Sequence, residues 1–226
     1  MPIIFIGGTD TEIGKTWVTC RLLAALRGQG LSCVGYKPVA AGCEWRDGQW
    51  LNDDALRLQA ASSVSRPYAE INPIALPEPI APHLAAARAG QVIDPERMVA
   101  GAVHLQQYAD WVLVEGAGGL RVPLTTSEDL LDVVQRAGWP VVLVVGMRLG
   151  CLNHALLSAQ ALQAAGAAWS WVANVLPPVQ PHVQDNIATL VQRMPAPCLE
   201  LEPALAVAGL QNLGTRATSR NQSPGT

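Results

Sequence analysis

Short apolar segments alternate with longer segments of helical periodicity along most of the chain, and this alternation restricts the fold more than any other feature. The short segments are apolar at nearly every position, so strands formed by them would be buried on both faces. A parallel sheet with helices on both faces buries its strands in this way. The five expected strands cover residues 3–6, 33–36, 111–114, 141–145 and 169–173.

The segments between these strands carry helix signals. Residues 16–27 place apolar side chains three or four positions apart, and Gly28 follows them as a stop signal. Asp94 followed by Pro95 is typical of a helix start. We expect the other helices at residues 53–63, 95–108, 129–137, 152–165 and 182–193, a long surface loop at the Pro-rich residues 64–82, and a disordered polar tail at residues 211–226.

A glycine-rich segment joins the first expected strand to the first expected helix. Residues 8–16 read GTDTEIGKT, and a loop in this position directs its backbone N–H groups at phosphate oxygens. Lys15 would bring its charge to the β- and γ-phosphates, and the Thr16 hydroxyl would bind Mg²⁺. The loop is a variant of the strict pattern, because Thr9 stands where glycine is usual and Gly8 lies beside it.

Length and composition fit one domain built around this loop. The chain has 226 residues, of which 50% are apolar and 15% charged, so it can bury a large core. We therefore predict a single α/β domain over residues 1–210 with a P-loop NTPase-like fold. Its central sheet would be mostly parallel, with helices on both faces.

Charge and hydropathy exclude several other classes of protein. The net charge of -3 gives no basic excess for binding along a nucleic acid. The longest apolar run, residues 141–145, is too short to cross a membrane, and the N-terminus has no signal-peptide pattern. Five widely spaced cysteines without a CxxC pair indicate reduced thiols, so we expect a cytoplasmic protein. From its charge and hydropathy we expect no nucleic-acid or membrane partner.

Acidic side chains follow two of the expected strands. Glu115 ends the strand at residues 111–114 and precedes a glycine-rich turn that would let a phosphate approach the backbone. Asp53 and Asp54 open a helix, where one of them suits the N-cap and leaves the other for a metal ion. An ordinary acid facing solvent is the alternative for Glu115.

Lys37 ends the second expected strand, and Pro38 after it keeps Lys37 out of a helix. A lysine at this edge of the sheet could stabilise the charge on a phosphoryl group during transfer. A surface lysine without a role in chemistry is the alternative.

Several blocks of the sequence together resemble the dethiobiotin synthase family. They are GTDTEIGKT (8–16), VGYKPVAAG (34–42), NDDA (52–55), Asn72-Pro73 with EPIAPH (78–83), WVLVEGAGGLRVPL (111–124), LVVGMRLGCLNHALLS (143–158) and WVAN (171–174). The match extends from about residue 3 to about residue 205. Their shared order makes a chance match implausible.

The resemblance implies a reaction of ATP, CO2 and 7,8-diaminopelargonate that gives dethiobiotin, ADP and phosphate, the penultimate step of biotin synthesis. In the family, one substrate amine captures CO2 as a carbamate, the carbamate attacks the γ-phosphate, and the second amine closes the cyclic urea. The resemblance also implies Mg²⁺, ATP as co-substrate, and a homodimer whose substrate site lies at the interface.

The resemblance assigns roles to residues of this sequence. Thr11, Lys15 and Lys37 would be catalytic, and Thr16, Asp54 and Glu115 would hold the metal ion. Residues implied at the nucleotide are Glu12, Ile13, Gly14, Lys15, Thr16, Trp17, Asp54, Glu115, Gly116, Ala117, Gly118, Asn174, Pro203, Ala204 and Leu205. Residues implied at the substrate are Thr11, Lys37, Ala41, Leu149, Gly150 and Asn153, the last three reaching across the two-fold interface to the substrate's tail carboxylate.

Two departures and several alternatives accompany the resemblance. Many family members carry serine where this chain has Ala41, and residues 200–202 (ELE) replace an expected Gly-Glu-hydrophobic pattern. A helix cap is the alternative role for Asn153.

Three other functions remain candidates for the protein. They are a P-loop amidoligase, which is usually longer, a P-loop switch, and an inactive paralogue. A guanine-specific switch would carry an Asn-Lys-x-Asp segment, which this sequence lacks.

Overall fold

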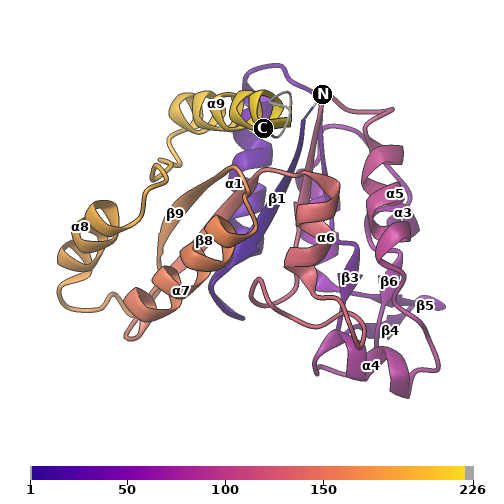
Figure 1. Cartoon of the computed structure of the whole chain (residues 1–226). Coiled ribbons are helices and arrows are strands. Elements are labelled where there is room, and N and C mark those ends of the chain that lie inside the picture. The colour runs from indigo at the N-terminus through magenta and orange to yellow at the C-terminus, as the bar shows by residue number, and fades with distance from the viewer. Residues whose placement is uncertain (1, 222–226) are drawn as a thin grey trace.

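The computed structural model describes residues 2–221, with side chains for residues 2–218. A five-stranded parallel sheet forms its centre, with the strand order β2-β7-β1-β8-β9 (Figure 1). These strands are β1 (Ile3–Gly8), β2 (Cys33–Tyr36), β7 (Trp111–Glu115), β8 (Val141–Met147) and β9 (Trp169–Val175). All five expected strands are therefore confirmed, and so are the parallel sheet and the α/β class.

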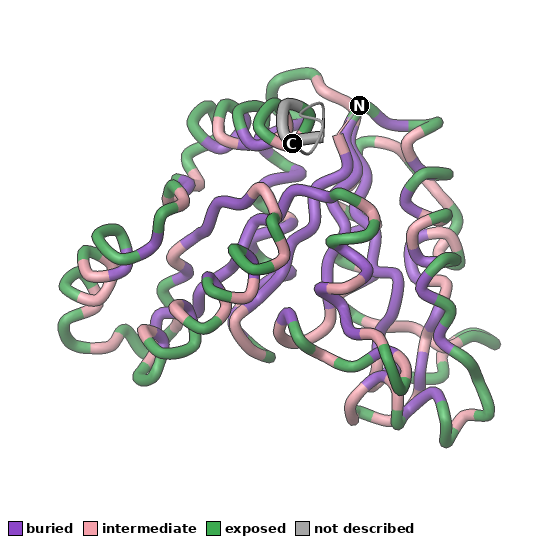
Figure 2. Tube along the Cα trace, viewed as in Figure 1, coloured by how far each residue is buried: buried purple, intermediate pink, exposed green. Residues whose placement is uncertain are grey.

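Helices cover both faces of the sheet, because successive side chains of a strand point to opposite sides. Ile4 and Ile6 of β1 pack into one hydrophobic core, and Ile3 and Phe5 pack into the other. Figure 2 shows the strands buried between these layers. The first core includes α1 (Lys15–Gly28), α2 (Asp53–Ala61) and α9 (Pro203–Asn221); the second includes α5 (Pro95–Leu105), α6 (Leu130–Ala137), α7 (Cys151–Ala164) and α8 (Val183–Arg193).

The six expected helices are all present, with ends shifted by a few residues. The expectation of a surface loop at residues 64–82 is wrong. This segment forms α3 (Tyr68–Ile71), β6 (Ile74–Ala75) and the start of α4 (Pro82–Arg88), and Ile71 and Leu76 within it are fully buried. The prolines break regular structure but still allow short elements that cover the second core.

Small elements that the sequence did not predict gather at the end of the sheet where its strands end (Figure 1). β6 pairs in parallel with β3 (Val39–Ala40), and β4 (Glu44–Arg46) forms an antiparallel hairpin with β5 (Gln49–Leu51). Ligands of open parallel sheets bind beside this end of the strands. None of the described helices is long and apolar enough to cross a membrane.

The expected disordered tail is wrong up to Asn221, where α9 ends. Ala206, Val207, Leu210 and Leu213 recur at helical spacing and are buried against the core that includes α1. The polar composition of the tail hid this stripe. Residues 222–226 lie outside the described part of the chain. The single-domain organisation stays a prediction, now with α9 included.

We expect Leu213→Ala to lower the free energy of unfolding by about 2–4 kcal/mol, because Leu213 is 1% exposed and its removal leaves a cavity. The matched control is Leu205→Ala on the same helix, since Leu205 is 51% exposed and should cost less than about 0.5 kcal/mol. Urea denaturation of both variants measures the difference. Equal stability of the two variants would show that the end of α9 does not pack on the domain.

Candidate active site

The glycine-rich loop between β1 and α1 has the shape that phosphate binding requires. Gly14 has a φ of 80°, in the left-handed region that favours glycine. A Cβ at Gly14 would lie 2.3 Å from Asn174 Nδ2, which donates a hydrogen bond of 2.7 Å to the Ile13 carbonyl. Asn174 near the end of β9 therefore contacts Ile13 and Gly14 and holds the loop just before α1 begins.

Lys15 begins α1 where the loop ends, and among the described residues no carboxylate is hydrogen-bonded to its ammonium group. Its Nζ donates to the Asp10 carbonyl oxygen at 2.8 Å, and the residue is only 7% exposed. Burial, and then the nearby charge of Lys37, lower the pKa of Lys15 to about 8. The carboxylates of Glu115, Asp54 and Asp10 only partly offset these effects, so a bound phosphate would favour the charged form of Lys15 further.

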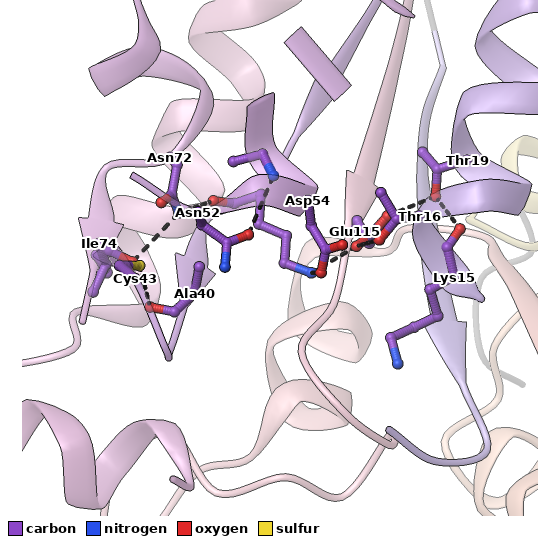
Figure 3. Close-up of polar contacts among 12 residues, drawn as sticks. Lys15, Thr16, Thr19, Ala40, Cys43, Asn52, Asp54, Asn72, Ile74 and Glu115 are labelled. Atoms are coloured by element: carbon purple, nitrogen blue, oxygen red, sulfur yellow. Dashed lines mark hydrogen bonds and ion pairs between the residues drawn. The ribbon is translucent and has the colours of Figure 1, made fainter. Parts of the chain in front are cut away.

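Glu115 is fully buried at the end of β7 and accepts three hydrogen bonds. Lys37 Nζ lies 2.6 Å from Oε1, Thr16 Oγ1 donates to Oε1 at 2.8 Å, and Thr19 Oγ1 donates to Oε2 at 2.9 Å. Figure 3 shows Thr16, Thr19, Asp54 and Glu115 converging on one point. The solvent-facing alternative for Glu115 is therefore wrong, because a buried carboxylate needs such partners.

Lys37 joins the two acidic residues into one cluster. Its Nζ also lies 3.2 Å from Asp54 Oδ2, and the residue is 4% exposed, so it is not a surface lysine. Burial disfavours the charge of Lys37, but Glu115 and Asp54 outweigh this effect and raise its pKa. Lys37 also holds the pKa of Asp54 below its usual range, against the opposing effect of burial.

The start of α2 differs from the expectation in its capping residue. Asn52, and neither aspartate, caps the helix, because its side chain accepts from the Ala55 N–H at 3.2 Å. Both acids are therefore available for other contacts. Asp54 turns to Lys37, whereas the exposed Asp53 pairs with Arg46 at 3.0 Å.

The turn after β7 lies beside the phosphate loop. The Gly116 N–H donates to the Ile6 carbonyl at 3.1 Å, and Ala117 follows it, half-buried. Gly118 has a φ of 67°, and a Cβ there would lie 3.5 Å from Thr11 Oγ1. Thr11 and its neighbour Glu12 are exposed in the loop. The two glycine-rich segments thus face each other.

Other implied site residues lie outside the cluster around Lys37. Trp17 is half-exposed on α1, and Ala41 is half-buried just after β3. The implied residues in the first turn of α9 are exposed: Pro203, Ala204 and Leu205. Those around the start of α7 are exposed as well: Leu149, Gly150 and Asn153. Gly150 itself occupies the N-cap position of α7, so Asn153 is not a helix cap.

Four residues of the site were missed by the sequence analysis. Thr19 lies one turn after Thr16 on α1 and also donates to Glu115. The spacing of three residues places both hydroxyls on one face of the helix, which could have indicated this role from the sequence. Asn72 is buried and donates to the Lys37 carbonyl at 2.7 Å, which fixes the backbone that carries the ammonium group. Asp10 and Arg148 form an ion pair across the loop, and no local pattern reveals a contact between residues so far apart.

The fold and the site together define a P-loop nucleotide-binding protein. Solved structures with the same fold include the MinC:MinD cell division complex of Aquifex aeolicus, with a TM-score of 0.54 and 15% identity over 100% of this chain and 98% of that chain. The septum site-determining protein MinD of Pyrococcus horikoshii gives a TM-score of 0.52 and 19% identity, covering 98% of this chain and 96% of that one. These identities show the fold alone.

Sequence comparisons narrow the class to one family. A family model described as an AAA domain matches residues 3–200. The ATP-dependent dethiobiotin synthetase of Aromatoleum aromaticum is 49% identical over 205 residues, which cover 90% of this chain and 91% of the relative. That of Pseudomonas paraeruginosa is 50% identical over 211 residues, covering 92% of each. The chain belongs to this AAA-domain family and, within it, to the ATP-dependent dethiobiotin synthetases, which are cyclo-ligases.

We expect Lys37→Met to lower the free energy of unfolding by about 3 kcal/mol or more, because it leaves the buried Glu115 carboxylate without its cation. The double variant Lys37→Met with Glu115→Gln should regain most of this loss, since it removes both charges. Chemical denaturation of the wild type and the two variants decides between the outcomes. A double variant as unstable as Lys37→Met would mean that the charge pair does not set the stability of the site.

Proposed function

We propose that this protein closes the urea ring of dethiobiotin from 7,8-diaminopelargonate and CO2, with ATP as co-substrate. The observation that carries the proposal is the buried Lys37 ammonium group beside Glu115, next to the phosphate loop. Family membership supports the overall conversion in the biotin pathway. The intermediates, the metal ion, the residue roles and the dimer are further parts of this proposal.

The proposed sequence has three steps. An amine of the substrate attacks CO2 and loses a proton, which gives a carbamate. A carbamate oxygen then attacks the γ-phosphorus of ATP and expels ADP, which leaves a carbamic-phosphoric mixed anhydride. The second amine attacks the carbamoyl carbon, loses a proton and expels phosphate, which closes the ring.

The charged groups of the site suit these steps. Lys37 has a raised pKa, so it stays protonated and can face both the carbamate and the γ-phosphate. Lys15 contributes a second cation at the end of the phosphate loop. Its Nζ donates to the Asp10 carbonyl oxygen, and a phosphate oxygen of ATP can replace that acceptor. Thr11 is exposed at the rim, where its hydroxyl can contact the substrate amine.

Thr16, Asp54 and Glu115 fit a bound Mg²⁺, because they offer one hydroxyl and two carboxylates, all of them hard oxygen donors. Among the described residues, no group of three or more His, Cys, Asp or Glu side chains forms a metal site. A Mg²⁺ site of this kind therefore depends on the Thr16 hydroxyl and on phosphate oxygens of the nucleotide. Bound with ATP, Mg²⁺ would shield the charge of the phosphates.

The remaining nucleotide contacts come from elements that border the loop. We propose that the adenine lies near Asn174 at the end of β9 and near the first turn of α9, residues 203–205. Trp17 lies next to Thr16 on α1 and is 52% exposed, so it borders the same region. Backbone N–H groups from Glu12 to Thr16, together with those of Ala117 and Gly118, complete the phosphate site, while the Gly116 N–H stays bonded to the Ile6 carbonyl.

We further propose a homodimer in which Leu149, Gly150 and Asn153 of one subunit reach the tail carboxylate of the substrate bound to the other. Leu149 is 95% exposed, so a second subunit can contact it. Asn153 is exposed as well, so a second subunit can bring it to a substrate. We assign the protein to the cytoplasm, since all five cysteines are free thiols.

The central test measures ATP turnover with each substrate omitted in turn. ADP release should require both the diamine and bicarbonate, and mass spectrometry should detect dethiobiotin in equal amount. A switch protein would hydrolyse ATP without the diamine, and an inactive paralogue would show no turnover. Either result would contradict the proposed function.

We expect Lys37→Gln to lower the turnover number by on the order of 10² to 10³, because a neutral amide cannot stabilise the charge that develops during phosphoryl transfer. ATP affinity should change little, because Lys37 directly follows β2 and lies outside the phosphate loop. Steady-state kinetics and calorimetric ATP titration provide the two readouts. An equal loss of affinity and rate would make Lys37 a binding residue.

Ala41→Ser should lower the KM for the diamine, because a hydroxyl at this position can hydrogen-bond the reacting end of the substrate. We expect a change of roughly three- to a hundredfold, nearer the low end because a water molecule beside Ala41 can supply part of the bond. The turnover number should stay the same. An unchanged KM would mean that position 41 does not contact the substrate.

A mixture of two variants tests the shared site, provided that each variant alone has little activity. We expect Lys37→Gln and Asn153→Ala subunits, mixed after unfolding and refolding together, to regain about a quarter of wild-type activity, since half of the dimers would contain one complete site. Each variant refolded alone is the control. Absence of any regained activity, with dimers confirmed by sedimentation, would place all site residues in one subunit.

A further inference from the structure

Asp10 places a carboxylate inside the phosphate loop, where the proposed ligand carries several negative charges. Its Oδ1 accepts the Thr11 N–H at 2.7 Å, so the side chain is folded against the loop. An uncompensated charge at this position would repel a polyphosphate. The loop therefore needs a cation for Asp10 in addition to Lys15.

Arg148 provides that cation from the neighbouring strand. Its Nη2 donates to Asp10 Oδ2, and both side chains are about two-fifths exposed. β1 and β8 are adjacent in the sheet, and the Thr9 N–H donates to the Val144 carbonyl at 3.1 Å, which brings the residue after β8 to the loop. The Arg148–Asp10 pair thus follows directly from the strand order.

The surroundings of Asp10 are cationic on more than one side. The Thr11 N–H first, and then Arg148 and the more distant His154, lower the pKa of Asp10. The carbonyl of the same residue accepts from Lys15 Nζ. If Lys15 turns to a phosphate, Arg148 and the Thr11 N–H are the contacts that keep Asp10 in place.

We propose that Arg148 is a positioning residue that neutralises Asp10 and so lets the phosphate loop accept the polyphosphate of ATP. The proposal rests on the proposed nucleotide site. In this role Arg148 acts through Asp10 and does not touch the nucleotide itself. Loss of Arg148 would therefore harm binding chiefly because it leaves Asp10 uncompensated.

Four variants separate this role from direct contact. We expect R148Q to raise the Kd for ATP, measured by calorimetry, at least about tenfold, because one member of a charge pair is left beside the ligand. D10N should stay within about threefold of the wild type, and the double variant D10N/R148Q should match D10N. R148K should rescue most of the affinity, since it keeps the charge.

The matched control is R136Q, because Arg136 on α6 is 41% exposed and also pairs with carboxylates, Glu96 and Glu128, outside the proposed site. Its ATP affinity should equal that of the wild type. Added salt should shrink the R148Q defect, since the repulsion is screened. Thermal unfolding of each variant, which should match the wild type within a few degrees, separates a binding defect from a folding defect.

Two results would overturn the proposal. A double variant as weak as R148Q, with turnover reduced on the order of 10² to 10³, would show that Arg148 contacts the nucleotide directly. R148Q with unchanged ATP affinity would show that the ion pair has no role in binding. A wild-type chain that does not bind ATP at all would contradict the proposed function, a result distinguishable from both.

Discussion

The buried ion pair between Lys37 and Glu115 sets the requirements that the rest of the site satisfies. A carboxylate with no exposure to water is costly unless a cation and hydrogen-bond donors surround it. The residue after β2 supplies the cation, and α1 supplies the hydroxyls of Thr16 and Thr19. The register that pairs Tyr36 with Val114 brings the two strand ends level, so the chemistry depends on how β2 and β7 align.

The regular part of the fold could be predicted because its signals are local. Most strands of the central sheet are short apolar runs, and the first helix has a clear apolar periodicity that ends at Gly28. The errors occurred where composition was misleading. Prolines in residues 64–82 suggested a loop although Ile71 and Leu76 fill the core, and polar residues after position 210 concealed Leu213.

The candidate site could be predicted only in part, for a geometric reason. A motif shows which residue types follow each strand, and Lys15, Thr16, Lys37, Asp54 and Glu115 were found in this way. It does not show which side chains meet, because strand order and register decide that. The buried position of Asn72 under Lys37, the Asn52 cap and the Arg148–Asp10 pair depend on contacts between separate elements, which a single sequence does not display.

Because the strands of the central sheet are parallel, the two ends of the described chain lie away from the phosphate loop. β1 begins near the N-terminus and leads to the phosphate loop, while Arg216 of α9 lies beside Trp169, where β9 begins. Both ends of the described chain therefore lie near the edge opposite the phosphate loop (Figure 1). An affinity tag or a surface tether attached at either end would leave the nucleotide side open, so the enzyme suits immobilisation without redesign.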